Sequence, residues 1–207
     1  AGYDSFYPDS DRIYQIIGKA KSTGKQFNNG QIPYIAVNKL EQAFPEIESI
    51  ALEYPSIGSS FKQQGKKLEG NSSLEAVDEH FFQMFPPRVV AGDVNENTLK
   101  NNDEIVITES FAIKHFGSPE KAAGETLIAG GNKSSIINAV ITNPPSNSIF
   151  QKEAYVADIY ARLFCERTDE KTQWEHVRNI KLYIKLYSRT DVSEFRKKLL
   201  TFAIDNG

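Results

Sequence analysis

The segment Val77–Leu127 places the strongest constraint on the fold, because an apolar anchor, a polar loop, a strand and a helix follow one another in it. Its first part carries large side chains that are too apolar to remain in water, namely Phe81, Phe82, Met84 and Phe85. Gly92 and Asp93 mark a turn, and residues 95–103 form a polar loop. No catalytic residue type recurs here at an informative spacing, so the segment is architectural.

The second part of this segment predicts a short strand followed by a short helix. Ile105–Ile107 is an apolar run typical of a buried strand. Thr108 is suited to cap a helix, and Gly117 suits its C-terminal exit. The apolar face of this helix would consist of Phe111, Ala112 and Phe116.

The N-terminal part predicts strand, helix and strand. Residues 12–17 have strand character, and Ser22–Gln31 is polar and contains glycine, which favours a loop. Pro33 is well placed at the start of a helix whose apolar residues continue to Phe44. Ile47–Tyr54 resembles a second strand, so these three elements would form half of an α/β layer.

The middle of the chain predicts hairpins with one wet face. Scattered apolar residues in a polar context indicate them, namely Phe61 with Gln63, and Leu68 with Leu74 and Ala76. Residues 129–133 make a turn, and Ile136–Thr142 returns as an apolar strand.

The C-terminal part predicts strands and a final helix. Tyr155–Phe164 favours a strand, and the Ile180–Tyr187 segment alternates apolar residues with Lys or Tyr. We expect one face of that strand to be buried and the other, with Tyr183, Lys185 and Tyr187, to be wet. A helix with an apolar stripe would follow, started by Asp191 and Glu194 in a capping-box-like pattern; the stripe comprises Phe195, Leu199 and Phe202.

These elements predict an α+β fold built from two subdomains. Residues 1–55 and 150–207 would form an α/β subdomain from both ends of the chain. Residues 56–149 would form an inserted β-rich subdomain with one short helix.

Composition narrows the function classes. The formal net charge of −3 argues against nucleic acid as a partner, since nucleic-acid binding calls for a clustered basic surface. Cys165 is the only cysteine, so an internal disulfide is impossible and cysteine usage does not assign the compartment. No apolar run reaches the roughly 18 residues of a membrane span. Both ends look cut, which favours a piece of a longer protein.

Several residues could in principle carry metal chemistry. Asp9 and Asp11 form a D-x-D pair, but short acidic residues beside serine favour a turn. Asp78, Glu79 and His80 offer ligand atoms, yet adjacent residues on an extended chain point apart, and no second cluster has a recognisable spacing.

The remaining candidates also favour structural roles. His115 would be a partly exposed helix residue, while His176 and Cys165 have no identifiable partner. Gly130–Ser135 lacks the spacing of a phosphate loop and lies between predicted strands, so we expect a hairpin turn. The Tyr183, Lys185 and Tyr187 face could contact a partner, although an ordinary sheet face covered by the final helix is favoured. We therefore predict no catalytic, cofactor-binding or metal-binding residues.

Several ordered blocks resemble the extracytoplasmic domains of FtsX-like and MacB-like ABC transporter permeases. Residues 3–14 resemble the family pattern Y-D-x-F-H-x-x-x-x-R-I-Y, with Tyr7 in place of His. Residues 77–93 resemble V-D-x-x-F-F-x-x-F followed by G-D, and residues 105–117 are similar to V-V-I-S-E-S-x-A-x-x-x-F-G. Residues 124–127 match G-K-T-L except at Glu125, and residues 121–123 replace the usual D-P-I. The resemblance covers about the first 150 residues.

The resemblance implies a porter-like α/β part and an inserted β-rich, sabre-like part. Because no catalytic site is recognisable in the sequence, we do not expect the isolated domain to be an enzyme. The resemblance places the domain on the periplasmic side of the bacterial inner membrane, between two membrane helices of a permease. A separate or fused cytoplasmic ATPase would drive it, the full permease would be a homodimer, and a periplasmic adaptor or substrate would be its partner.

The sequence leaves three functions open. The preferred one is a mechanical module that relays ATP-driven motion to the export or release of a peptide, lipoprotein or small toxic molecule. The alternative is a stand-alone periplasmic ligand-binding or sensor domain. A hydrolase ranks last, because no nucleophile–base or carboxylate pair is recognisable.

Overall fold

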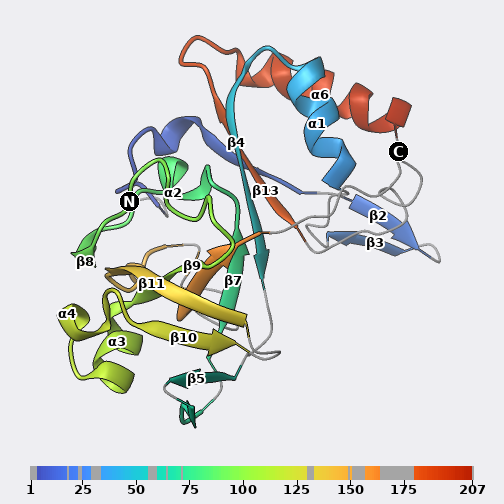
Figure 1. The fold of residues 1–207 in the computed structure, drawn as a ribbon. Coiled ribbons are helices and arrows are strands. Elements are labelled where there is room, and N and C mark those ends of the chain that lie inside the picture. The colour runs from blue at the N-terminus through green and yellow to red at the C-terminus, as the bar shows by residue number, and fades with distance from the viewer. Residues whose placement is uncertain are drawn as a thin grey trace.

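One mixed sheet runs through the structure (Figure 1). The computed structural model describes residues 4–17, 19–22, 25–28, 34–55, 60–63, 65–70, 72–129, 133–148, 150, 157–163 and 180–206. The described elements are, in chain order, η1 (Ser10–Arg12), β1 (Ile13–Ile16), β2 (Lys19–Ser22), β3 (Lys25–Asn28), α1 (Tyr34–Ala43), β4 (Ile47–Pro55), β5 (Phe61–Gln63), β6 (Lys66–Lys67), β7 (Leu74–Val77), α2 (Phe81–Met84), β8 (Val89–Gly92), β9 (Glu104–Thr108), α3 (Glu109–Phe116), α4 (Pro119–Ala122), β10 (Thr126–Ala129), β11 (Lys133–Ile141), β12 (Ile159–Arg162), β13 (Lys181–Leu186) and α6 (Val192–Asn206).

Eleven of the strands form the large sheet, in the order β1-β13-β4-β7-β12-β9-β11-β10-β5-β6, with β8 paired to β11. Two strand pairs, β11 with β9 and β12 with β7, are parallel, and the other pairs of this sheet are antiparallel. Helices combined with such a sheet confirm the predicted α+β fold class. Along the described ranges, no helix has the length and apolarity that crossing a membrane requires.

Helices α1 and α6 lie on one face of β4 and β13, at the end of the sheet shown at the top of Figure 1. The Phe44 ring lies 5.3 Å from both the Phe195 and Phe202 rings. These rings close a core that includes the predicted buried face of β13, namely Ile180, Leu182, Ile184 and Leu186. The structure therefore confirms the predicted strands, the helix ending near Phe44 and the apolar stripe of the final helix.

The opposite face of β13 is not wet, so that part of the sequence prediction is wrong. Tyr183 is only 3% exposed, and its ring lies 5.1 Å from that of Phe85. Lys185 is half-buried in ion pairs, whereas Tyr187 is 54% exposed as expected. The reason is tertiary: α2 and Phe150 cover this face, and the sequence around β13 contains no sign of them.

Tyr183 belongs to an aromatic cluster, defined here as Tyr7, Phe81, Phe82, Phe85, Phe150, Tyr160 and Tyr183. Ring centroids lie 5.1 Å apart in the Phe85–Phe150 pair and 5.5 Å apart in the Phe81–Phe150 and Phe82–Tyr160 pairs. These edge-on contacts are favoured by the ring quadrupoles and exclude water. The cluster confirms the expected burial of the aromatic anchor in residues 81–85.

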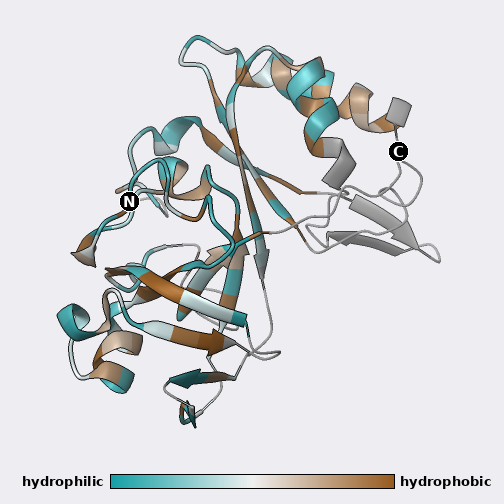
Figure 2. Ribbon diagram, viewed as in Figure 1, coloured by the Kyte–Doolittle hydropathy of each residue, from teal (hydrophilic) through white to brown (hydrophobic). Residues whose placement is uncertain are grey.

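At the other end of the sheet, α3 and α4 pack on β9, β10 and β11. Hydrophobic residues concentrate along β11 (Figure 2), and Ile137, Ala139, Val140 and Ile141 are buried there. Ala129 pairs with Lys133 across the predicted turn, so β10 and β11 form the expected hairpin. The predicted strand at Ile105–Ile107 is confirmed within β9.

The predicted helix starts at Thr108 and Asp191 are confirmed, whereas Pro33, the third, lies outside the described residues. The Thr108 hydroxyl accepts a hydrogen bond from Phe111 N at 3.4 Å, and Asp191 Oδ1 accepts from Ser193 N and Glu194 N at 2.9 and 3.1 Å. Gly117 ends α3 with φ = 87°, a left-handed conformation that favours glycine.

Two further expectations about the chain are wrong. The segment around Ser22–Gln31 contains the second strand of a β2–β3 hairpin rather than only a loop. Its strands are polar and lack the apolar alternation that would have revealed them. β5 and β6 form the predicted hairpin, but β7 pairs with β4 and β12 instead of with a strand near Leu68. Such non-local pairing leaves no local signal.

Strand β4 joins the two ends of the sheet. Lys181–Leu186 pairs with one edge of β4, and β7 pairs with Glu53, Tyr54 and Pro55 on its other edge. The sheet therefore continues across the predicted boundary at residue 55 without a break. The division into residues 1–55 with 150–207 and residues 56–149 stays a prediction.

A buried charge sits at this junction. Glu53 is 0% exposed; its carboxylate accepts hydrogen bonds from Lys181 Nζ at 3.0 Å and from Tyr183 Oη at 2.8 Å. A buried carboxylate is tolerated only when its partners remain. The geometry thus requires the β4–β13 register, because a shift of one residue would move these partners to the other face.

We expect Lys181→Met to lower the free energy of unfolding by about 3 kcal/mol, because it removes the ammonium group that pairs with the buried Glu53 carboxylate. The double variant Glu53→Leu/Lys181→Met should recover most of that loss, since no charge then remains to be desolvated. Urea denaturation of both variants and the parent measures this. A double variant less stable than Lys181→Met would contradict the account.

A second titratable group lies where β7 ends and α2 begins. The carboxylate of Asp78 accepts a hydrogen bond from His80 N at 3.2 Å. Burial raises the Asp78 pKa to about 6, with the neighbouring backbone N–H groups and His80 acting in the opposite direction. Because the folded state favours the protonated acid, Asp78 stabilises the fold at acidic pH, and this contribution is lost as the pH rises from about 4 through about 6.

The Asp78→Asn variant should therefore be more stable than the parent at pH 7, by an amount on the order of 1–3 kcal/mol, because it removes a poorly hydrated charge. The gain should disappear near pH 4. Thermal or urea unfolding across this range measures the difference. Asp103→Asn, at an exposed position, controls for the loss of one negative charge. Equal gains at pH 4 and pH 7 would contradict this reading of the Asp78 pKa.

Candidate functional site

The first acidic pair, Asp9 and Asp11, lies in the N-terminal turn. Asp9 adopts φ = 57° just before η1, and its carboxylate lies 3.0 Å from Arg12 and 2.8 Å from Lys185. Hydrogen bonds from Lys185 and then Arg12 lower the Asp9 pKa. Asp11 is exposed in the same turn. Asp9 thus lies in a turn and contacts two cations, which agrees with the expected turn role.

Asp9 is part of an ion quartet, defined here as Asp9, Arg12, Glu48 and Lys185. Glu48 lies 2.5 Å from Arg12 and 3.0 Å from Lys185, so each anion contacts both cations. Arg12 Nη1 also donates to the backbone carbonyl of Leu186 at 2.7 Å. Because Glu48 is on β4 and Lys185 on β13, the quartet attaches the N-terminal turn to two strands of the sheet.

The side chains of the second candidate group, Asp78, Glu79 and His80, do not point toward a common site. Asp78 contacts its own loop backbone, Glu79 Oε2 lies 3.7 Å from Arg162 Nη2, and His80 is exposed at the start of α2. Within the described part of the chain, no group of three His, Cys, Asp or Glu side chains could hold a metal ion.

Of the remaining histidine and cysteine candidates, the structure describes His115. His115 is half-buried on α3 with its ring 4.5 Å from Phe111, and burial followed by the Lys114 charge lowers its pKa. It is a helix residue, as expected. Cys165 and His176 lie outside the described residues, as do Gly130–Asn132 of the glycine-containing turn.

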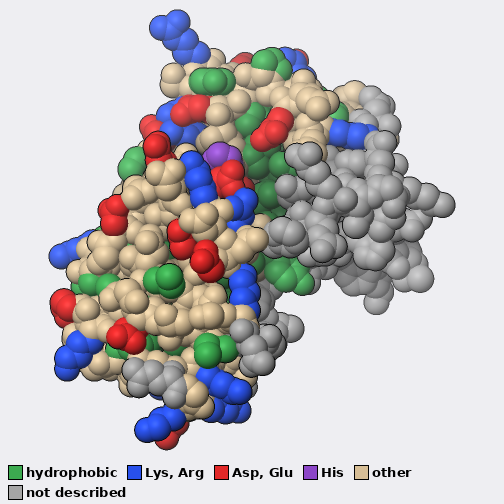
Figure 3. Space-filling view, viewed as in Figure 1, with side chains coloured by type: hydrophobic (Ala, Val, Ile, Leu, Met, Phe, Trp, Pro, Cys, Tyr) green, Lys and Arg blue, Asp and Glu red, His purple; other side chains and the backbone are tan. Residues whose placement is uncertain are grey.

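The alternative that the Tyr183, Lys185 and Tyr187 face of β13 contacts a partner retains one exposed residue. Tyr183 is buried and Lys185 is engaged in the ion quartet, so only Tyr187 remains exposed. Figure 3 shows Lys, Arg, Asp and Glu intermingled on the visible face, without a field of a single sign.

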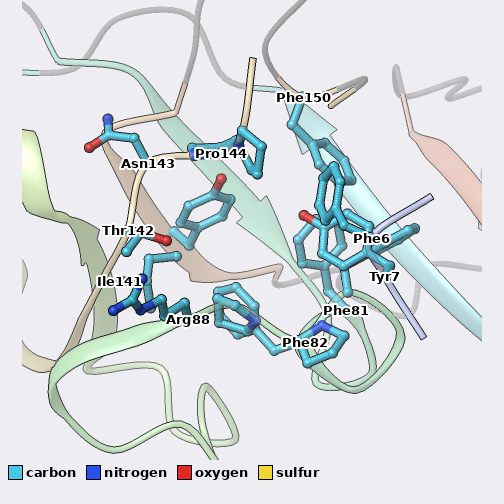
Figure 4. A pocket seen from close by; sticks show the side chains of 15 residues that line it. Phe6, Tyr7, Phe81, Phe82, Arg88, Ile141, Thr142, Asn143, Pro144 and Phe150 are labelled. Carbon is cyan, nitrogen blue, oxygen red and sulfur yellow. The ribbon is translucent and has the colours of Figure 1, made fainter. Parts of the chain in front are cut away.

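A pocket that the sequence did not predict opens beside the aromatic cluster (Figure 4). We call it the aromatic pocket. It has a volume of about 170 Å³. We call the buried cluster rings that line it, including Phe81, Phe82 and Phe150, its floor, and the two more exposed proline pairs of the lining its rim. The rim prolines are Pro86, Pro87, Pro144 and Pro145.

The polar groups of the aromatic pocket are few. Arg88, Thr142 and Asn143 lie at one end of it, and Phe6 and Tyr7 at the other (Figure 4). Burial, followed by the nearby Asp4 charge, raises the Tyr7 pKa to about 12, so Tyr7 stays protonated. The described lining contains no His, Cys, Asp, Glu, Lys or Ser. Its chemistry is therefore suited to binding apolar groups.

Sequence reasoning missed this site although a signal exists. Each proline pair follows an apolar segment, Phe81–Phe85 or Ile136–Thr142. Proline fixes the backbone and removes an N–H donor, which makes a stiff rim. That the two pairs face one pocket depends on the β8–β11 pairing, which brings Val89 opposite Ile141.

Comparison with known proteins identifies the family. The MacB-like periplasmic core domain family matches residues 2–202. No curated protein sequence matches the chain significantly. Solved structures with the same fold include a domain of a protein described as a permease from Porphyromonas gingivalis, with 16% identity, a TM-score of 0.74, and coverage of 99% of this chain and 85% of that one.

Two further structures show the fold. The periplasmic region of MacB from Actinobacillus actinomycetemcomitans has 14% identity and a TM-score of 0.63, covering 93% of this chain and 82% of that one. The extracellular domain of the noncanonic ABC-type transporter YknZ from Gram-positive bacteria has 11% identity and a TM-score of 0.55, covering 90% and 86%. These findings confirm the predicted resemblance and the porter-like and sabre-like fold. The chain belongs to the family of MacB-like periplasmic core domains, which are parts of ABC transporter permeases that work with ATPase subunits.

Proposed function

We propose that this domain is a mechanical relay, which passes ATP-driven motion of its permease to a substrate on the periplasmic side of the bacterial inner membrane. The substrate would be a peptide, a lipoprotein or a small toxic molecule that is exported or released. The observation that carries the proposal is the unbroken sheet, in which β4 pairs with strands from both ends of the molecule. The domain itself performs no catalysis in this scheme.

A relay must move as one body, because a soft joint would absorb the motion. Three features stiffen the joint around β4. Backbone hydrogen bonds continue through it, the aromatic cluster packs across it, and the Glu53 carboxylate holds two β13 side chains at it. A hinge would need a segment with few buried contacts, and β4 is the opposite: Ile50, Ala51, Leu52 and Glu53 are all buried.

The ion quartet supports the input side of the relay. Its contacts fix the N-terminal turn on β4 and β13, which would connect a preceding membrane helix to the sheet. Exposed ion pairs contribute little to stability. Here the ion pairs instead set the orientation of the N-terminal turn, because two anions and two cations in contact at 2.5–3.0 Å define one orientation.

The wider assembly follows from the same proposal. The ATPase would be a cytoplasmic subunit or a fused domain, the permease would act as a homodimer, and a periplasmic adaptor could join it. Family membership favours this arrangement over a stand-alone ligand-binding or sensor domain. The aromatic pocket is compatible with either function, so motion and not binding discriminates between them.

The relay predicts that the domain keeps its internal geometry while it moves. Spin labels at Lys67→Cys on β6 and Arg196→Cys on α6, both exposed, report the distance between its two ends. In the full-length permease with its ATPase, reconstituted in nanodiscs with Cys165→Ser, this distance should not change between the nucleotide-free and vanadate-trapped states. Pulsed electron spin resonance measures it.

The single-label variant Arg196→Cys provides the matching measurement, because its distances run between the two copies of the permease. These should change between the same two states. A constant distance between copies would refute the relay, and so would a change within the domain as large as the change between copies.

A further inference from the structure

The aromatic pocket has the dimensions of one side chain. Its volume of about 170 Å³ is close to that of cavities that accept a single aromatic ring, about 150 Å³. Its floor consists of rings from the aromatic cluster, and Phe81, Phe150 and Tyr160 are each at most 5% exposed. These rings are held by one another, so the pocket is preformed and binding need not order its floor.

Arg88 is the cation among the described residues that line the pocket. Arg88 is exposed, and none of the residues that the structure describes forms an ion pair or a side-chain hydrogen bond with it. Asn143 cannot serve a ligand equally well, because its amide already bonds to Ser110 through both Oδ1 and Nδ2, at 3.1 and 2.8 Å. The prolines of the rim offer no N–H donors. A guanidinium in this position suits a carboxylate, with which it can form paired hydrogen bonds.

The apolar surface continues outside the pocket. Phe6, on the lining, is 43% exposed, and Val89, which follows Arg88, is 38% exposed. A ligand no larger than the pocket would leave these side chains in water. The surface therefore fits a longer chain whose terminal ring enters the pocket and whose preceding residues lie over the rim.

We propose that the aromatic pocket binds the free C-terminus of a peptide chain that ends in a hydrophobic, ring-bearing residue. The ring fills the pocket, and the terminal carboxylate pairs with Arg88 while remaining partly hydrated. The Thr142 hydroxyl provides a second donor at the same end of the pocket. This inference goes beyond the proposed relay, since the pocket can bind without any motion of the permease.

The test is calorimetric titration of the 207-residue domain with acetyl-Gly-Ser-Gly-Phe as the free acid and as the C-terminal amide. The acid should bind about tenfold more tightly, because the amide loses the charge-assisted pairing. Arg88→Gln should weaken binding of the acid by about the same factor and leave binding of the amide unchanged. Thr142→Phe, which fills the pocket entrance, should abolish binding of both.

Arg196→Gln is the matched control, because it removes the same charge from the exposed face of α6 and should not change either affinity. Thermal unfolding of each variant verifies that it is folded. Equal affinities for acid and amide, or an Arg88→Gln variant that binds the acid as the parent does, would overturn the proposal. 3-Phenylpropionate tests a small aromatic acid, and binding as tight as that of the peptide would overturn the assignment to a peptide terminus.

These outcomes are separate from those of the spin-label experiment. Loss of the C-terminal peptide preference leaves the relay intact if the distance between permease copies still changes. Conversely, the domain could bind the peptide while the distance between permease copies stays constant. This result would reject the relay and retain the pocket assignment, and it is the result expected of a sensor domain.

Discussion

Burial of the aromatic cluster is the interaction on which the rest of the structure depends, because segments that are far apart in the chain meet in it. Tyr7 comes from the N-terminal turn, Phe81, Phe82 and Phe85 from α2 and its end, and Tyr183 from β13. Each such ring buries roughly 150–250 Å². No pair of sheet strands could bring these segments together without that burial, since backbone pairing alone does not choose which strands meet.

The cluster and β4 act together at the joint of the molecule. The cluster packs on Ala51 and Val77, which belong to the adjacent strands β4 and β7, and Tyr183 extends from it to the Glu53 carboxylate. Apolar packing therefore gives the joint its stability, and the buried carboxylate adds a requirement for one register. The ion quartet, at the surface, contributes orientation more than energy. Together they make a stiff body, which is the property that a relay needs.

The same rings also form the floor of the aromatic pocket, so core and candidate site are not independent. A ligand in the pocket would contact side chains that hold the joint. Binding and stiffness are thereby connected through shared contacts, and not through a distant pathway. The exposed Arg88 stands outside this core, which is why charge recognition can be altered there without disturbing the packing.

The sequence by itself determined the local elements whose cause is local. The alternation at Ile180–Tyr187, the caps at Thr108 and Asp191, and the left-handed Gly117 each follow from a few neighbouring residues, and the ordered blocks identified the family. Only the tertiary structure decided that both faces of β13 are covered, which strands flank β7, and that two proline pairs border one pocket. These features depend on contacts between residues far apart in the chain. Hydrophobic burial drives such contacts, but it is a non-directional interaction. A local sequence pattern therefore shows that a side chain will be buried and does not show which distant residue it will contact.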